Sequence, residues 1–130
     1  MKKIILDTNF LMIPLEFRVD IFSEIDRICH FNYKLFVYEQ SVSELKNIMQ
    51  KQASAHKKAA QFGLKLIKLK NIAMIDSEQK DVDTLILENL DKDTIVATQD
   101  IALKKEVLEK GSCVIILRKK KHLQLIGKAL

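Results

Sequence analysis

Acidic side chains follow the strand-like segments of this sequence, and they are the residues best suited to chemistry. Asp7 comes directly after the apolar run 4–6, with no turn residue between them. The other acids in comparable positions are Glu44, Asp81, Asp83 and Asp100. Carboxylates drawn together repel one another, and a bound divalent cation is the usual compensation. Oxygen ligands without histidine or cysteine favour Mg²⁺ or Mn²⁺ over zinc.

These acids form one site only if the fold brings the ends of the strands together. Short apolar segments rich in β-branched or aromatic residues predict strands at 3–6, 34–38, 72–75, 94–98 and 113–117. Helical spacing of apolar residues predicts helices near 19–28, 41–50 and on to 69, 82–90 and 101–108, the last ended by Gly111. This alternation predicts a three-layer α/β/α fold around a central, mainly parallel sheet of four to five strands.

Four successive strand-to-helix junctions each carry a carboxylate. Asp7 ends the first strand, and Glu44 lies in the first turn of the helix after the second. Asp81 and Asp83 begin the helix after the third strand, and Asp100 follows the fourth strand by two residues. The carboxyl ends of parallel strands meet at one edge of a sheet, which is where ligands bind in such folds. The sequence therefore predicts an acidic site at that edge.

Most of these acids also have a purely structural interpretation. Residues 41–44 read Ser-Val-Ser-Glu, which matches a helix capping box. Asp100 suits the N-cap of its helix. Asp81 and Asp83 stand where acids favour the helix dipole, with Ser77 as the cap. The acid that ends the first strand is left without a structural task, because either of the two residues after it can cap the next element. The joint pattern therefore favours a functional site.

Composition limits the class of protein. The chain has 130 residues, of which 48% are hydrophobic and 30% charged, which is typical of a single folded domain over residues 1–130. No apolar run approaches the ~20 residues of a membrane span. The N-terminal segment contains too few consecutive apolar residues for a signal peptide. The expected location is the cytoplasm, with Cys29 and Cys113 reduced. The absence of a glycine-rich phosphate loop argues against nucleotide binding of the P-loop or Rossmann kind.

Basic residues are concentrated in two parts of the chain. The net charge is +5, and residues 45–75 contain seven lysines and no acid. A second acid-free stretch comes after Glu109 and includes the run Arg118–Lys121. Such stretches attract polyanions, nucleic acids above all. The alternative is an ordinary lysine-rich, solvated helix face.

The segments around the acids resemble a known family. In order along the chain, the segments "ILDTNFLM", "SVSELKNI", "DVDTLILENL" and "VATQDIALKKEVLEKG" are similar to the four acidic motifs of PIN-domain nucleases. The similarity covers essentially the whole chain. More narrowly, "DTNFLMIPLEFRVDIFSEI" and "VIILRKKKHLQL" resemble PIN proteins related to small-subunit ribosomal RNA processing endonucleases. They look less like the toxins of toxin–antitoxin pairs.

The resemblance implies a PIN-like fold and a set of metal-binding, catalytic acids. These would be Asp7, Glu44, Asp83 and Asp100, with Mg²⁺ or Mn²⁺ as the cofactor. Asn9 and Thr98 are similar to polar residues that orient the first and last carboxylates. Asp83 is preferred to the supporting residue Asp81 because the family acid precedes an acid–x–apolar–apolar pattern. Thr84 occupies a place where the family often has another acid, which implies a slightly less acidic site.

The resemblance also implies an activity, namely metal-dependent endonucleolytic hydrolysis of RNA, with precursor ribosomal RNA as a substrate. Two alternatives stay open. One is a toxin-type PIN ribonuclease held inactive by a partner, and the other is a catalytically weak RNA-binding module that keeps the fold. No Ser–His or Cys–His arrangement in the sequence suggests a protein nucleophile.

The basic stretches supply the predicted RNA contacts. These are Lys46, Lys57, Lys58, Arg118, Lys119, Lys120 and Lys121. In the first stretch, Ala59, Phe62, Leu66 and Leu69 share a helix face that we assign to the core. Few aromatic rings then remain for base stacking, so the affinity for RNA should be mostly electrostatic. The run Arg118–Lys121 has an alternative role as a contact with a second copy of the chain in a homodimer.

Overall fold

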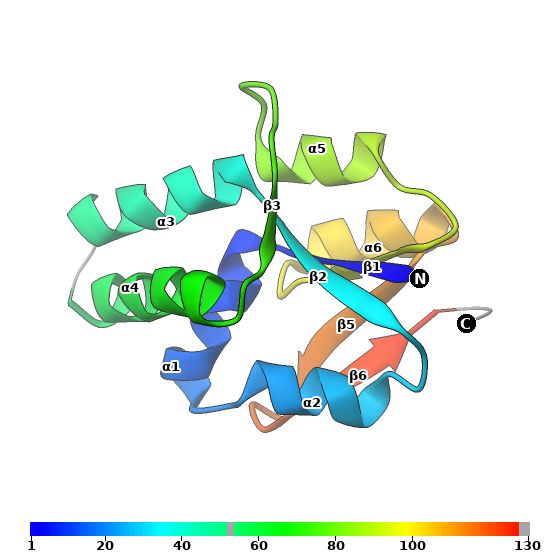
Figure 1. Cartoon of the computed structure of the whole chain (residues 1–130), viewed down its shortest axis with the longest axis horizontal. Helices are drawn as coiled ribbons and strands as arrows, with labels where there is room; N and C mark the ends of the chain where they lie inside the picture. Colours follow the sequence, from blue (N-terminus) through cyan, green and yellow to red (C-terminus); the bar gives the residue numbers. More distant parts are fainter. Residues whose placement is uncertain (52–53, 128–130) are drawn as a thin grey trace.

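A six-stranded sheet forms the centre of the molecule in the computed structural model, which describes residues 1–51 and 54–127 (Figure 1). Its strands are β1 (Lys2–Leu6), β2 (Tyr33–Tyr38), β3 (Ala73–Ile75), β4 (Thr94–Ala97), β5 (Cys113–Arg118) and β6 (His122–Ile126). Their order across the sheet is β3-β2-β1-β4-β5-β6, and only the β5–β6 pair is antiparallel. The five predicted strands are confirmed to within one residue at each end, and β6 is an addition to them.

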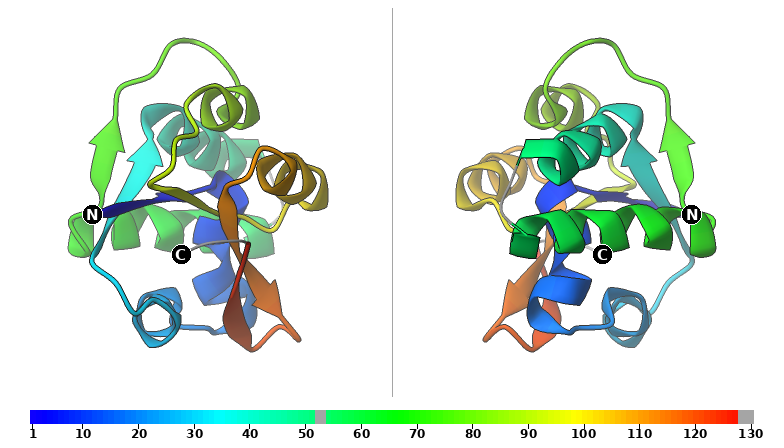
Figure 2. Two further views of the ribbon diagram at one scale, coloured as in Figure 1. Left: turned by 90° about the vertical axis from the view of Figure 1, so that its right-hand side faces the viewer. Right: turned by 90° about the vertical axis from the view of Figure 1, so that its left-hand side faces the viewer.

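Helices cover both faces of this sheet. They are the 3₁₀ helix η1 (Thr8–Met12) and the α-helices α1 (Ile13–Phe17), α2 (Ile21–Ile28), α3 (Glu39–Lys51), α4 (Ser54–Leu69), α5 (Val82–Glu88) and α6 (Ile101–Glu109). In Figure 2, α5 and α6 lie on one side of the sheet, and α1, α2 and α4 lie on the other. The predicted three-layer α/β/α architecture is thereby confirmed. None of the helices among the described residues is long and apolar enough to cross a membrane.

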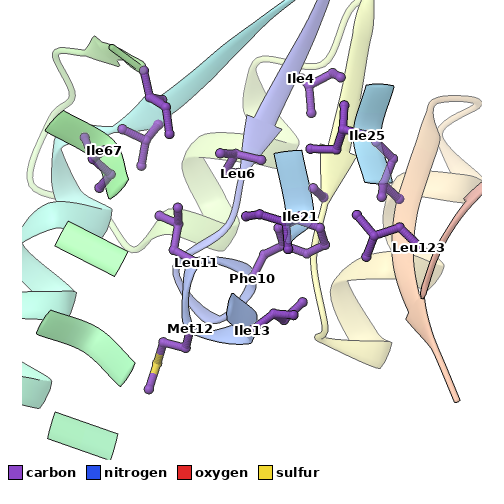
Figure 3. Close-up of a cluster of buried hydrophobic side chains, with 14 of the residues drawn as sticks. Ile4, Leu6, Phe10, Leu11, Met12, Ile13, Ile21, Ile25, Ile67 and Leu123 are labelled. Carbon is purple, nitrogen blue, oxygen red and sulfur yellow. The ribbon is translucent and has the colours of Figure 1, made fainter. Parts of the chain in front are cut away.

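The strands alternate their side chains between two hydrophobic clusters. On β1, Ile4 and Leu6 join the cluster beneath η1, α2 and α4, whereas Ile5 joins the cluster beneath α5 and α6. Phe10 from η1 and Ile21 from α2 pack in the first cluster beside the β1 side chains (Figure 3). Each such side chain gains roughly 1.5–3 kcal/mol from burial. This packing fixes β1 rigidly, including the point at which it ends.

A glycine brings α4 against η1. A Cβ added at Gly63 would lie 2.7 Å from the backbone oxygen of Leu11, closer than real contacts allow. Because of this close approach, the face of α4 that packs toward η1 is the one that contains Ala60, Gly63 and Ile67, whose spacing places them on one side of a helix. The prediction that Phe62 and Leu69 face the core was therefore wrong: their side chains are 37% and 74% exposed. The other two members of the predicted face are buried.

The strand order locates the place where ligands bind in open α/β sheets. Strands β1, β2 and β3 are added in one direction, after which the chain crosses back to place β4 on the other side of β1. The carboxyl ends of β1 and β4 therefore form the topological switch point, where neighbouring loops diverge and leave a crevice. The residues immediately after these two strands are Asp7 and Thr98.

Candidate active site

Asp7 is held between the two strands at the switch point. Its backbone N–H donates to the carbonyl oxygen of Ala97 at 2.9 Å, and its side chain is only 4% exposed. One carboxylate oxygen accepts the N–H of Thr8 at 2.9 Å, and the other accepts the hydroxyl of Thr98 at 2.6 Å. The prediction that Asp7 has no structural task was wrong, because it is the N-cap of η1.

The surroundings of Asp7 disfavour its ionised form. Burial raises the pKa of this carboxyl above its usual range, and the charges of Glu44 and Asp100 raise it further. The hydrogen bonds from Thr98 and Thr8 oppose this shift, since they stabilise the carboxylate. The net effect is a raised pKa, because desolvation, with the smaller contribution of charge repulsion, outweighs the hydrogen bonds. A carboxylate in this environment is stabilised by any cation that approaches it.

Glu44 reaches the site from the second turn of α3. Helix α3 begins at Glu39, so Ser41 lies inside the helix and the predicted capping box does not form. The Thr8 hydroxyl lies 2.5 Å from Glu44 Oε1 and 2.9 Å from Ser41 Oγ. A carboxylate can only accept, so the single proton of Thr8 goes to Glu44, and the Ser41 hydroxyl donates to Thr8. This relay orients Glu44 from residues of two different elements.

The two acids at the start of α5 lie in different environments. Asp81 is the N-cap by position, but it makes no capping hydrogen bond and is exposed; Ser77, the expected cap, does not serve as one. Asp83 is half-buried and has no hydrogen-bond partner in the described part of the chain. Burial raises the pKa of Asp83 to about 6, and the charges of Asp7 and Asp100 add to the shift.

Thr98 connects the first and last acids. While its hydroxyl donates to Asp7, its oxygen accepts the backbone N–H of Asp100 at 3.0 Å. The Asp100 side chain accepts the N–H of Leu103 at 3.1 Å, which makes Asp100 the N-cap of α6 as the structural interpretation predicted. One hydroxyl thus fixes the relative positions of the residues after β1 and β4.

The Asn9 side chain is hydrogen-bonded to the backbone of Gln99, the residue before Asp100, and does not orient a carboxylate as predicted. Its side-chain oxygen accepts the backbone N–H of Gln99 at 3.1 Å, and the Gln99 amide donates to the Asn9 carbonyl oxygen at 2.8 Å. This reciprocal pair joins η1 to the loop between β4 and α6. Sequence reasoning did not single out Gln99, although its position between Thr98 and Asp100 was a usable signal. An amide can supply both the donor and the acceptor that two converging loops require.

Residues 4–120 match the sequence profile of a protein family described as a PIN like domain. The chain belongs to this family. Over 129 residues it is 28% identical to ribonuclease VapC4 of Methanocaldococcus jannaschii, an alignment that covers 98% of each chain. Its fold is similar to the solved structure of the PIN domain endonuclease Utp24, with a TM-score of 0.76, 17% identity, and coverage of 98% of this chain and 95% of the other. The resemblance drawn from the four acidic segments is thereby confirmed.

The donor set of this PIN-like domain suits a hard divalent cation. Within residues 1–51 and 54–127, no three acidic, histidine or cysteine side chains are already grouped closely enough to hold a metal ion. The acids are nevertheless close enough to interact electrostatically. The charges of Glu44 and Asp100 raise the pKa of Asp7, and the charges of Asp7 and Asp100 raise the pKa of Asp83. Mg²⁺ keeps several of its waters, so a few direct carboxylate contacts are enough for it. The chemistry of these carboxylates therefore fits Mg²⁺ or Mn²⁺.

The predicted RNA contacts lie on two surfaces of the PIN-like domain. Lys46, Lys57 and Lys58 are exposed on α3 and α4. Arg118 is the exposed last residue of β5, where its guanidinium donates to Gln124 at 2.7 Å, and residues 119–121 form the exposed turn before β6. Within the described ranges, none of these basic side chains forms an ion pair. Their charges are therefore available to a polyanion.

Proposed function

We propose that this PIN-like domain is a metal-dependent endoribonuclease that hydrolyses phosphodiester bonds within RNA chains. The observation that carries the proposal is the burial of Asp7 at the switch point, where the charges of Glu44 and Asp100 bear on it. Ribonuclease VapC4, similar to this chain over 98% of both lengths, supports the activity. The shared fold with the PIN domain endonuclease Utp24 is consistent with it.

In this proposal the four acids hold one or two Mg²⁺ or Mn²⁺ ions. The metal-holding residues are Asp7, Glu44, Asp83 and Asp100. A bound divalent cation would acidify a water molecule and neutralise charge that builds on the phosphate oxygens. The protein's own contribution is to place the carboxylates. The Thr98 hydroxyl fixes Asp7, and the Thr8 hydroxyl, itself fixed by Ser41, orients Glu44.

The substrate we propose is precursor ribosomal RNA. The support is the similarity of the two longer segments, residues 7–25 and 114–125, to PIN proteins related to ribosomal RNA processing endonucleases. A toxin-type ribonuclease would need the same acids but would cleave other RNAs. A binding module without turnover would retain RNA and leave it intact. The substrate and the products therefore separate the three functions.

The test is an incubation of the purified protein with precursor ribosomal RNA, and separately with transfer and messenger RNA. Each reaction contains Mn²⁺, Mg²⁺ or EDTA, and the ends of the products are mapped. We expect internal cleavage of the precursor by the wild type only when a metal is present, and loss of cleavage in Asp7→Asn. Asp91→Asn is the matched control, because Asp91 lies at the opposite edge of the sheet. Cleavage that survives Asp7→Asn or EDTA would contradict the proposal.

Two other results would assign the alternatives. Cleavage confined to transfer or messenger RNA would favour the toxin-type function. Retention of RNA by the wild type without any cleaved product, in every metal tested, would favour the binding module.

A further inference from the structure

A hollow of about 470 Å³ adjoins the acidic site on the side of β5. Thr98 and Asp100, which belong to the site, line one part of it, and the turn residues Lys119 and Lys120 line another. Lys104, one turn into α6, also borders it. A chain bound across the acids would therefore meet this hollow next, without leaving the surface.

Apolar side chains form most of the remaining lining, beside Gln99 and Arg118. Phe17 at the end of α1 and Ile101 at the start of α6 both border the hollow, and Ile101 is 77% exposed. An aromatic ring and an aliphatic side chain beside open space offer flat, apolar contact to a planar ring. Nucleobases are ligands of that shape, and every base has a face that can stack.

The lysines around the hollow are not neutralised within the chain. Lys104, Lys119 and Lys120 have no carboxylate partner in residues 1–51 and 54–127. By contrast, Lys3 is bonded to Asp91 at 2.7 Å at the other edge of the sheet. Unpaired cations beside an apolar lining suit a ligand with a phosphate next to a base.

The geometry points to a nucleotide-binding subsite: we propose that this hollow holds the nucleotide adjacent to the scissile phosphate in a single-stranded segment of RNA. Its base packs against Phe17 and Ile101, and its phosphate lies near Lys104 and the Lys119–Lys120 turn. The inference rests on the proposed function, because the same RNA chain must cross the acids. A base that is paired in a duplex is not available to enter a hollow, so the subsite selects unpaired RNA.

Phosphate contacts can be tested with substitutions that preserve the fold. Lys119 and Lys120 have φ values of 52° and 57°, a left-handed conformation that asparagine and glycine adopt more readily. Lys119→Asn/Lys120→Gly therefore removes both charges and keeps the turn. Lys104→Ala removes the third charge, and Lys105→Ala, the next residue on α6 and exposed, is its matched control. Binding of a labelled oligouridine RNA is measured by fluorescence anisotropy in EDTA, over a range of salt concentrations.

We expect the turn variant to lower the slope of log affinity against log salt by about two, and Lys104→Ala by about one. Lys105→Ala should leave the slope unchanged. Equal slopes for Lys104→Ala and Lys105→Ala, or a turn variant that binds like the wild type, would overturn the proposal.

The base contact needs a second experiment. The wild type is titrated with oligouridine and with the same ribose-phosphate chain lacking its bases. Loss of the bases should weaken binding on the order of tenfold. Ile101→Ala should bind the two chains more equally, whereas Leu69→Ala, an equally exposed apolar residue on α4, should keep the wild-type ratio. A ratio near one in the wild type, or an unchanged ratio in Ile101→Ala, would show that no base enters the hollow. Both experiments measure binding, so the subsite can stand even where no cleavage is found and the proposed hydrolysis fails.

Discussion

Aspartates at the two edges of the sheet have pKa shifts in opposite directions. We call the edge where the parallel strands begin the amino edge, and the edge where they end the carboxyl edge. At the amino edge, Asp91 accepts a hydrogen bond from Lys3 at 2.7 Å and another from Thr94. These bonds, and the one from Lys3 above all, lower the pKa of Asp91 to about 2. At the carboxyl edge, burial and neighbouring acids raise the pKa of Asp7 and of Asp83. The amino edge is neutralised by the chain's own lysines, whereas the carboxyl edge is left with unbalanced negative charge. Such an edge is suited to a cation supplied from solution.

The contrast also separates stability from function. An ion pair at the amino edge favours the folded state at neutral pH, when both partners are charged. The acids at the carboxyl edge do the reverse, because folding brings their charges together and removes water from Asp7. Natural proteins tolerate such costs at functional sites, which is where perturbed pKa values cluster. Substitutions and metal additions at each edge can establish whether the two differ in this way.

The largest expected effect is stabilisation by metal at the carboxyl edge alone. Mn²⁺ at about 100 times its dissociation constant should raise the free energy of unfolding by about 2.7 kcal/mol, because it binds only the folded chain. Asp7→Asn should abolish this gain, and Asp91→Asn should retain it. Thermal unfolding with and without Mn²⁺ measures the difference. A gain that survives Asp7→Asn would place the cation elsewhere.

Thr98→Val should impair the carboxyl edge while keeping the shape of the side chain. The change removes the donor to Asp7 and leaves the Asp100 N–H without its acceptor. Residues that orient metal ligands typically contribute 10- to 100-fold, so cleavage of RNA should fall by roughly that factor. Initial rates at saturating Mn²⁺ give the measurement. Thr94→Val, at the amino edge, is the matched control and should cleave normally.

Asp83→Asn should stabilise the metal-free protein at neutral pH. The folded-state pKa of Asp83 is about 6, above the ordinary value of 3.8, so the ionised form opposes folding. This penalty is absent below about pH 4 and grows as the pH rises through 6. After allowance for solvent screening at this half-buried site, the gain at pH 7 should be on the order of 1 kcal/mol. Urea unfolding in EDTA at pH 4 and pH 7 tests it.

The exposed neighbour Asp81 provides the control for that experiment. Asp81→Asn should change the free energy of unfolding by less than about 0.5 kcal/mol at either pH. It should also keep cleavage, whereas Asp83→Asn should lose it. Loss of cleavage in Asp81→Asn with normal cleavage in Asp83→Asn would show that Asp81, and not Asp83, belongs to the site.

The smallest effect should come from the amino edge. Asp91→Asn removes an exposed ion pair, so the free energy of unfolding at pH 7 should fall by about 0.2–1 kcal/mol. The pKa of Asp91 is lowered to about 2, so the contribution of its charge is present above pH 4 and disappears as the pH falls through 2. A loss that is unchanged at pH 2 would show that the ion pair is not its cause.

The sequence carries the parts of the fold that depend on local pattern. Buried parallel strands read as continuous apolar runs, which is why Ile4–Leu6 and its counterparts could be located closely. Strand β6 was missed because its hairpin turn is built from Lys119 and Lys120, which carry no turn signal. The face of α4 was misjudged because Gly63, and not the largest apolar residues, decides which side approaches η1.

The candidate site was predictable in its acids but not in its hydrogen bonds. The positions of Asp7 and Asp100 follow from their places after strands. The relay from Ser41 through Thr8, and the bonds of Gln99, join segments more than thirty residues apart. The place of Gln99 between Thr98 and Asp100 could single out that residue, but no local pattern names its partner, since these pairs exist only after the sheet has brought β1, β4 and α3 together. The capping box was misread for a different reason, because helix α3 starts two residues before Ser41.

The close approach at Gly63 has a consequence for protein engineering. Replacing a helical glycine with alanine ordinarily stabilises a protein by roughly 0.5–1 kcal/mol, and α4 would be an obvious target. Here the added methyl group would press on the Leu11 carbonyl of η1. Asp7 is the N-cap of η1, so a displacement of η1 would also move Asp7. A routine thermostabilising substitution on α4 would therefore alter the distances on which the site depends.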